Sequence, residues 1–150
     1  MNFDPYPYSR PSSRRYVFTS IGKGEIKKVV DFVSLKAKNF INLGFGDLQP
    51  DGSVDDKANS NNGDILKVFA TIVIILKDFT SRHPEAVIFF AGSTADRTRL
   101  YGRILKTYYA DFTEEFVVYA VTGTENDNYT IPFDPGDDFE FLAFLIKRIN

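Results

Sequence analysis

Hydroxyl, guanidinium and small side chains come close together at residues 92–101, Gly-Ser-Thr-Ala-Asp-Arg-Thr-Arg-Leu-Tyr. The segment follows an apolar run at residues 86–91 that is typical of a buried strand, and it opens a stretch with helical spacing. A strand that turns into a helix leaves the first backbone N–H groups of that helix free, at the positive end of its dipole. The segment therefore predicts an anion site. The side chains that would take part are Ser93, Thr94, Arg97 and Arg99.

The same residues also have a purely local interpretation. Ser93 is the expected N-cap of the helix, with Asp96 three residues further on in the spacing of a capping box. Asp96 also brings a negative charge into the turn, and the arginines have acidic residues available as partners. Anion binding and local capping both remain open at this point.

A second polar turn, Ser-Asn-Asn-Gly-Asp at residues 60–64, precedes the most apolar helical pattern of the chain. Asparagine and glycine tolerate the positive φ of a tight turn. Ser60 or Asn62 is a candidate cap for the helix. Alternatively, the turn lies beside Ser93 and adds amide donors to the same anion site. In that case the contributing residues would be Asn61, Asn62 and Gly63.

Other kinds of chemistry find little support in the residue types. The chain has no Cys and one His, His83, which excludes thiolate sites, multi-histidine zinc sites and a Ser-His-Asp triad built elsewhere. The aspartates of residues 47–56 lack the spacing of a calcium loop. We therefore expect no metal and no cofactor. Arg99, Arg103 and Lys106 recur at helical spacing and form a basic stripe that could contact nucleic acid. The net charge of −2 argues against such a partner.

The elements that would position these residues follow from hydrophobic periodicity. The predicted class is α+β, a single domain with a twisted, mixed and mostly antiparallel sheet, two main helices and the order β-β-β-α-β-α-β-β. The strands are expected at residues 15–21, 25–35, 40–45, 86–91, 116–122 and 139–146, and the helices at residues 64–81 and 94–110.

Two segments stand outside this pattern. Residues 1–14 are rich in Pro, Ser and Arg and predict an extended arm, so that the domain would span residues 15–150. The arm has no apolar stretch of the kind a signal peptide carries, and no apolar run is long enough for a membrane span. We therefore expect a cytoplasmic protein without membrane contact. The helix at residues 64–81 is apolar on most sides, and exposed surface around Ile74 or Ile75 would favour a homodimer.

The two polar turns resemble the signature of a family of small bacterial cytosolic proteins of unknown function. Its members carry S-N-N-G-D before an apolar helix and G-S-T-x-x-R-T-R-L-Y before a second helix, as this chain does at residues 60–64 and 92–101. The resemblance spans most of residues 15–148. It implies a bacterial, cytosolic origin and no particular activity.

A weaker resemblance is to the fold of the Gcn5-related N-acetyltransferases, whose central elements follow the same order. That family often has Leu-Tyr in the helix after the central strand, where the tyrosine is the general acid. The resemblance implies this role for Tyr101. The family's pyrophosphate loop is not matched, because residues 61–64 contain one glycine and an acidic residue.

Two functions of different classes are compatible with these observations. The first is a non-enzymatic binding or interaction module. The second is an enzyme, or a degenerate acetyltransferase-like protein, that binds a phosphate-bearing small molecule between the turns at residues 60–64 and 92–99. Whether the chain catalyses any reaction stays open.

Overall fold

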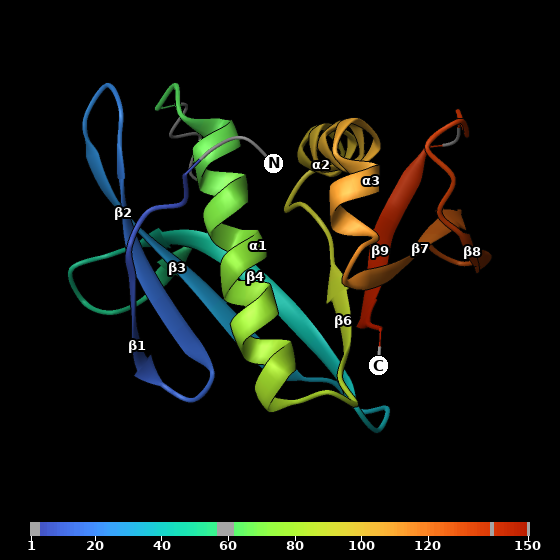
Figure 1. Cartoon of the computed structure of the whole chain (residues 1–150), viewed down its shortest axis with the longest axis horizontal. Helices are drawn as coiled ribbons and strands as arrows, with labels where there is room; N and C mark the ends of the chain where they lie inside the picture. Colours follow the sequence, from blue (N-terminus) through green and yellow to red (C-terminus); the bar gives the residue numbers. More distant parts are fainter. Residues whose placement is uncertain (1–3, 57–61, 139, 150) are drawn as a thin grey trace. The chain divides into compact units, whose positions relative to one another are not determined.

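The computed structural model describes residues 4–56, 62–138 and 140–149. Within these ranges it has nine strands and three helices, and every strand pair with a resolved register is antiparallel. The predicted α+β class, the mostly antiparallel sheet and the two main helices are therefore confirmed (Figure 1). The chain forms two compact units. The first holds Met1–Val33 with Leu43–His83, and the second holds Ser34–Asn42 with Pro84–Asn150.

In the first unit, four strands lie in the order β1-β2-β3-β4, β5 pairs with β4, and one long helix is present. The elements are β1 (Tyr8–Ser12), β2 (Arg15–Ile21), β3 (Glu25–Ser34), β4 (Phe40–Leu48, which begins in the second unit), β5 (Val54–Asp55) and α1 (Ile65–Arg82). Side chains alternate along β2, so that Tyr16 and Phe18 are buried while Val17 is half-buried. The buried face of β2 and β3 packs against α1, where Phe32 stacks on Phe79 with 3.8 Å between ring centroids.

The apolar character of α1 reflects its burial within the fold. Ile75 is fully buried, and Ile74 is half-buried. Ile75 therefore cannot belong to an exposed seam, which corrects the expectation for that residue. The helix ends at Arg82, where the N–H of His83 still donates to the carbonyl of Phe79 and Pro84 follows.

Tyr16 and Asp78 join β2 to α1 and give a testable pH dependence. The Tyr16 hydroxyl donates a 2.6 Å hydrogen bond to Asp78 Oδ2, and this bond, followed by Arg82, lowers the pKa of the Asp78 carboxyl. Burial, with the Asp78 carboxylate next, raises the pKa of Tyr16. A carboxylate whose pKa is lowered by folding stabilises the protein at every pH above its unfolded-state pKa of about 4. It loses that effect as the pH falls through its folded-state pKa.

We therefore expect Tyr16→Phe to cost ~1 kcal/mol of unfolding free energy at neutral pH, because it removes one hydrogen bond to a partly exposed carboxylate. Most of that difference should disappear in acid, once Asp78 is protonated in both proteins. Urea unfolding of both proteins across the acidic range measures it. A difference that stays constant down to the lowest pH would mean that the bond to the ionised carboxylate is not what stabilises the fold.

The second unit has the strand order β6-β9-β7-β8 and two helices. Its elements are β6 (Val87–Phe90), α2 (Ala95–Thr107), α3 (Tyr109–Phe112), β7 (Phe116–Gly123), β8 (Asn128–Pro132) and β9 (Phe141–Arg148). One row of buried side chains crosses the sheet, from Ile88 to Ile146 to Val118. Phenylalanine fills much of the remaining core. Phe133, for example, has its ring centroid 5.5 Å from that of Phe141 and 5.8 Å from that of Phe144.

The element order is close to the predicted one, with additions at the edges. β1 lies in the predicted arm, and β8 lies between the strands expected at residues 116–122 and 139–146. β5 is a two-residue strand, and the expected second helix is divided into α2 and α3. The added strands are short, and β1 and β8 contain or end in proline, so neither shows the apolar alternation that identifies a strand. The boundary between an arm at 1–14 and one domain at 15–150 stays a prediction. In the described residues no helix has the length and apolar character needed to cross a membrane.

Candidate functional site

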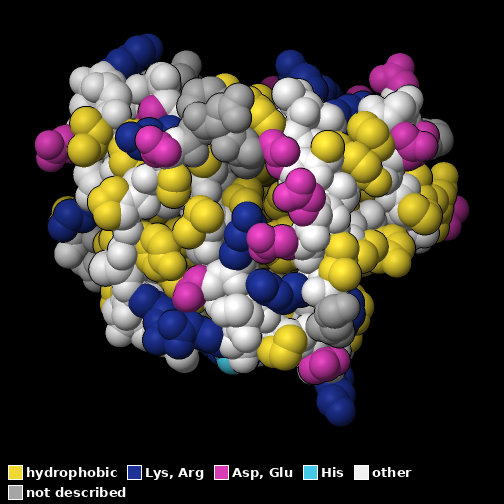
Figure 2. Space-filling model, viewed as in Figure 1, with side chains coloured by type: hydrophobic (Ala, Val, Ile, Leu, Met, Phe, Trp, Pro, Cys, Tyr) yellow, Lys and Arg dark blue, Asp and Glu magenta, His cyan; other side chains and the backbone are white. Residues whose placement is uncertain are grey.

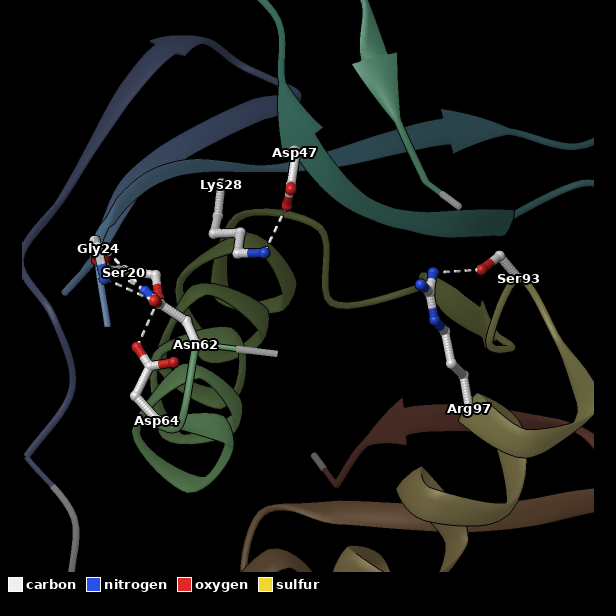
Figure 3. A network of polar contacts seen from close by, with 8 residues as sticks. All are labelled: Ser20, Gly24, Lys28, Asp47, Asn62, Asp64, Ser93 and Arg97. Carbon is white, nitrogen blue, oxygen red and sulfur yellow. Dashed lines mark hydrogen bonds and ion pairs between the residues drawn. The ribbon is translucent and has the colours of Figure 1, made fainter. Parts of the chain in front are cut away.

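The start of α2 holds the hydroxyl and arginine side chains of the predicted anion site, and its cap differs from the expected one. Thr94, not Ser93, is the N-cap, and its Oγ1 accepts a 3.2 Å hydrogen bond from the N–H of Arg97. Thr94 has the extended backbone that an N-cap requires. Ser93 Oγ instead accepts a hydrogen bond of 2.6 Å from Arg97 Nη1 (Figure 3). The structure therefore brings Ser93, Thr94 and Arg97 together.

The charges at this helix start are partly balanced. Arg99 lies 2.7 Å from Asp96 and 3.4 Å from Glu140 in ion pairs, so it is engaged on the exposed face of α2. Among the described residues, none accepts a hydrogen bond from the N–H of Ala95 or Asp96. Two free donors thus remain beside Arg97, as anion binding at a helix start requires.

Tyr101 lies one helical turn beyond Arg97, on the inner side of α2. Its ring stacks on Phe90, with 4.9 Å between centroids, and 8% of its surface is exposed. Burial raises the pKa of Tyr101, and the positive charge of Arg97 opposes this effect. A tyrosine in this position holds its proton at neutral pH. The role of general acid stays a prediction.

The turn before α1 belongs to the first unit, and its asparagine clamps the β2–β3 hairpin. Asn62 Oδ1 accepts from the N–H of Gly24 at 2.9 Å, and Asn62 Nδ2 donates to the Gly24 carbonyl at 2.8 Å and to Ser20 Oγ at 3.0 Å (Figure 3). The side chain is 7% exposed. Asn61 and Ser60 lie outside the described residues. Gly63 has φ +82°, which explains the glycine at that position.

Asn62 therefore does not cap α1, contrary to one of the two expectations for this turn. The N-cap is Asp64, and its carboxylate makes no capping hydrogen bond. Asp64 Oδ2 instead accepts from the hydroxyls of Tyr6 and Ser20, both at 2.6 Å. Asn62 and Asp64 thus join the N-terminal segment, the β2–β3 hairpin and α1, since both bond to residues far away in the sequence.

Two glycines of this hairpin give a matched test of the clamp. A Cβ on Gly22 would lie 1.9 Å from the backbone oxygen of Asn62, whereas a Cβ on Gly24 would meet no atom within 4 Å. We expect Gly22→Ala to destabilise the protein by ~2 kcal/mol or more, because backbone must move, and Gly24→Ala to change it by about 0.5 kcal/mol at most. Thermal unfolding of the two variants measures this contrast. Equal stabilities would contradict the close approach of the turn to the hairpin.

Buried Lys28 and half-buried Asp47 form an ion pair that the sequence pattern did not predict. Lys28 is 7% exposed, its ammonium contacts the Asp47 carboxylate, and it lies 5.7 Å from the centroid of the Phe45 ring (Figure 3). The alternation of side chains along β3 could have indicated that Lys28 is buried, because Lys28 shares a strand face with the apolar, buried Val30 and Phe32.

The acidic outer edge of the second unit was also missed. Residues 107–146 contain nine Asp and Glu and no Lys or Arg. Four of these carboxylates flank β8, the last strand of the sheet, and no described Lys or Arg forms an ion pair with them. They are Glu125, Asp127, Asp134 and Asp138. The excess of acidic residues within this part of the sequence could have predicted the acidic edge, which the net charge of the whole chain does not reveal.

Fold and site together define an α+β protein whose buried polar groups join its elements. Its second unit has two exposed polar features, the start of α2 and the acidic edge around β8. The chain belongs to the family of unknown function DUF6934, whose model matches residues 2–149. Comparison with curated proteins gave no match, and comparison with solved structures gave none.

Proposed function

We propose that this protein is a non-enzymatic interaction module that binds a basic partner through the β7–β8–β9 part of its second unit. The observation that carries the proposal is the unbalanced acidic edge described above, which surrounds exposed apolar side chains. Tyr129 is 57% exposed, and Tyr119 is 39% exposed. Figure 2 shows hydrophobic and acidic side chains next to one another over this part of the chain.

This combination favours recognition of a protein partner. Tyrosine is enriched at protein interfaces, where its ring contributes contact area and its hydroxyl a hydrogen bond. Carboxylates that form no ion pair with a described Lys or Arg attract a cationic partner and repel an anionic one. The buried ionisable groups of the first unit, by contrast, already bond to one another, as Tyr6 with Asp64 and Tyr16 with Asp78 show. These groups hold the fold together.

Calorimetric titration with a panel of synthetic peptides of different charge tests the proposal. We expect cationic peptides to bind, anionic ones not to, and the affinity to fall with added salt. The triple variant Glu125→Gln, Asp134→Asn and Asp138→Asn should weaken binding about tenfold, roughly 1.4 kcal/mol. The matched control is Asp4→Asn, Glu25→Gln and Asp51→Asn, which removes three carboxylates from the first unit. Equal loss in both triples, or no charge preference, would contradict the proposal.

A second candidate function is binding of a phosphate-bearing small molecule at the start of α2. The free N–H groups of Ala95 and Asp96 beside Arg97 favour it. Titration with inorganic phosphate, nucleotides and acetyl-CoA should then shift the amide resonances of these residues, and Arg97→Ala should abolish the shift. The same titration tests the predicted participation of Ser93, Thr94, Arg99, Asn61, Asn62 and Gly63. Unchanged amide resonances would remove this candidate.

The resemblance to a family of small bacterial cytosolic proteins extends the proposal to origin and location, which we take to be bacterial and cytoplasmic. A homodimer is part of the same proposal. Light scattering across a wide concentration range tests it, and a monomer throughout would contradict it.

A further inference from the structure

We infer that the outer edge of β8 pairs with an extended, basic segment of a partner protein, which adds a strand to the sheet. This inference rests on the proposed function and names its binding element and the kind of partner. β8 ends the strand order of the second unit, with β7 on one side and no described strand on the other. Added strands are a common mode of peptide recognition, because backbone hydrogen bonds supply the affinity.

The register of β7 and β8 determines which backbone groups face outward. The N–H of Phe133 donates to the carbonyl of Val118, and Asp127 and Thr124 exchange both of their backbone bonds. In an antiparallel pair, hydrogen-bonded residues alternate with residues whose backbone groups point away. Asn128 and Thr130 therefore each present an N–H and a carbonyl to the outer side, and Pro132 presents a carbonyl.

The acidic residues around β8 favour a basic partner segment over a second copy of this chain. The strand Asn-Tyr-Thr-Ile-Pro is itself uncharged, with Glu125 and Asp127 before it and Asp134 and Asp138 after it. A second copy of this chain, paired β8 to β8 in antiparallel fashion, would place the acidic start of one strand against the acidic end of the other. Like charges placed opposite each other are destabilising, so self-pairing is disfavoured. A segment with Lys or Arg at both ends meets carboxylates at both ends in either orientation.

The test uses the whole protein and three capped peptides. The first has the sequence Lys-Thr-Val-Thr-Val-Thr-Lys, and the second replaces both lysines with glutamate. The third keeps the lysines but is N-methylated at every residue, so that neither of its edges can donate a backbone hydrogen bond. We expect the first peptide to shift the amide resonances of Asn128–Pro132. The glutamate peptide should bind at least about tenfold more weakly. The methylated peptide should not bind, since it cannot donate to the outer carbonyls.

One substitution disrupts the outer edge of β8 without breaking a hydrogen bond between β7 and β8. Thr130→Pro deletes an outward N–H, and proline is tolerated on the open side of an edge strand. We expect the variant to keep its melting temperature within a few degrees and to lose the peptide. Thr130→Ala, which keeps the outward N–H, is the control and should bind normally.

The outcomes separate this inference from the proposed function. Binding of lysine peptides that needs the β8 carboxylates but tolerates N-methylation and Thr130→Pro would overturn strand addition while the interaction module stands. No preference among the peptides would overturn both. Self-association lost in Thr130→Pro would identify a second copy as the occupant and overturn the inferred partner. The methylated peptide decides the matter even if Thr130→Pro fails to fold.

Discussion

Replacing Lys28 with methionine is expected to lower the unfolding free energy by roughly 3–5 kcal/mol, the largest single effect in this protein. The substitution removes the ammonium that contacts the carboxylate of Asp47, and the Asp47 side chain is only 13% exposed. A carboxylate that loses its cationic neighbour inside the fold is less well compensated for its lost hydration, which costs more than the intact pair contributes.

The double variant Lys28→Met with Asp47→Leu should recover most of that loss, because it removes both charges and fills the same space. Urea unfolding of the wild type, both single variants and the double variant completes the cycle. The matched control is Arg99→Met, which breaks an exposed pair with Asp96 and should change stability by about 0.5 kcal/mol or less. A loss in Lys28→Met as small as that in the control would show that the pair is not buried in solution.

The second large effect is expected for Asn62→Ala, at roughly 2–4 kcal/mol. The substitution removes one acceptor and the donors of a buried amide that joins the turn before α1 to Ser20 and Gly24. Ser20 is fully buried, and its hydroxyl loses the Nδ2 donor of Asn62 while its bond to the Asp64 carboxylate remains. Guanidinium unfolding at neutral pH measures the difference.

Two further variants sharpen this prediction. Asn62→Asp keeps the acceptor for the Gly24 N–H but loses the donors and adds a charge close to Asp64, so it should be at least as unstable as Asn62→Ala. Asn128→Ala removes an amide whose Nδ2 donates to the Glu125 carbonyl in an exposed turn, and it should change stability by about 0.5 kcal/mol at most. If Asn62→Ala keeps its stability but loses phosphate binding, the result would contradict the stabilising role of Asn62 and support an anion site at this turn.

The regular elements of the fold were predictable where apolar periodicity was strong. The strand predicted at 15–21 is β2, and the helix predicted at 64–81 is α1 within one residue at each end. Both have a long, consistent pattern of buried side chains, which the sequence shows directly. β8 was missed because its stability comes from pairing with β7, whereas its own side chains are mostly exposed.

The candidate site was less predictable. The turn at residues 92–101 was located correctly, but backbone conformation placed Thr94 at the cap and Ser93 against the Arg97 side chain. Asn62 was expected to bind a ligand or cap a helix, and it bonds to a hairpin 38 residues earlier. A residue type defines which hydrogen bonds are possible, but only the folded chain decides which partner is near enough.

The sequence by itself determined the class of fold, the two main helices, the polar turn before each of them and the acidic character of residues 107–146. These properties depend on composition and on periods of a few residues, which local chemistry fixes. Only the tertiary structure decided that Lys28 lies with Asp47, that Asn62 clamps Gly24 and that β8 is the last strand in the order of the described residues. Each of these depends on strand order and register, which bring together groups far apart along the chain.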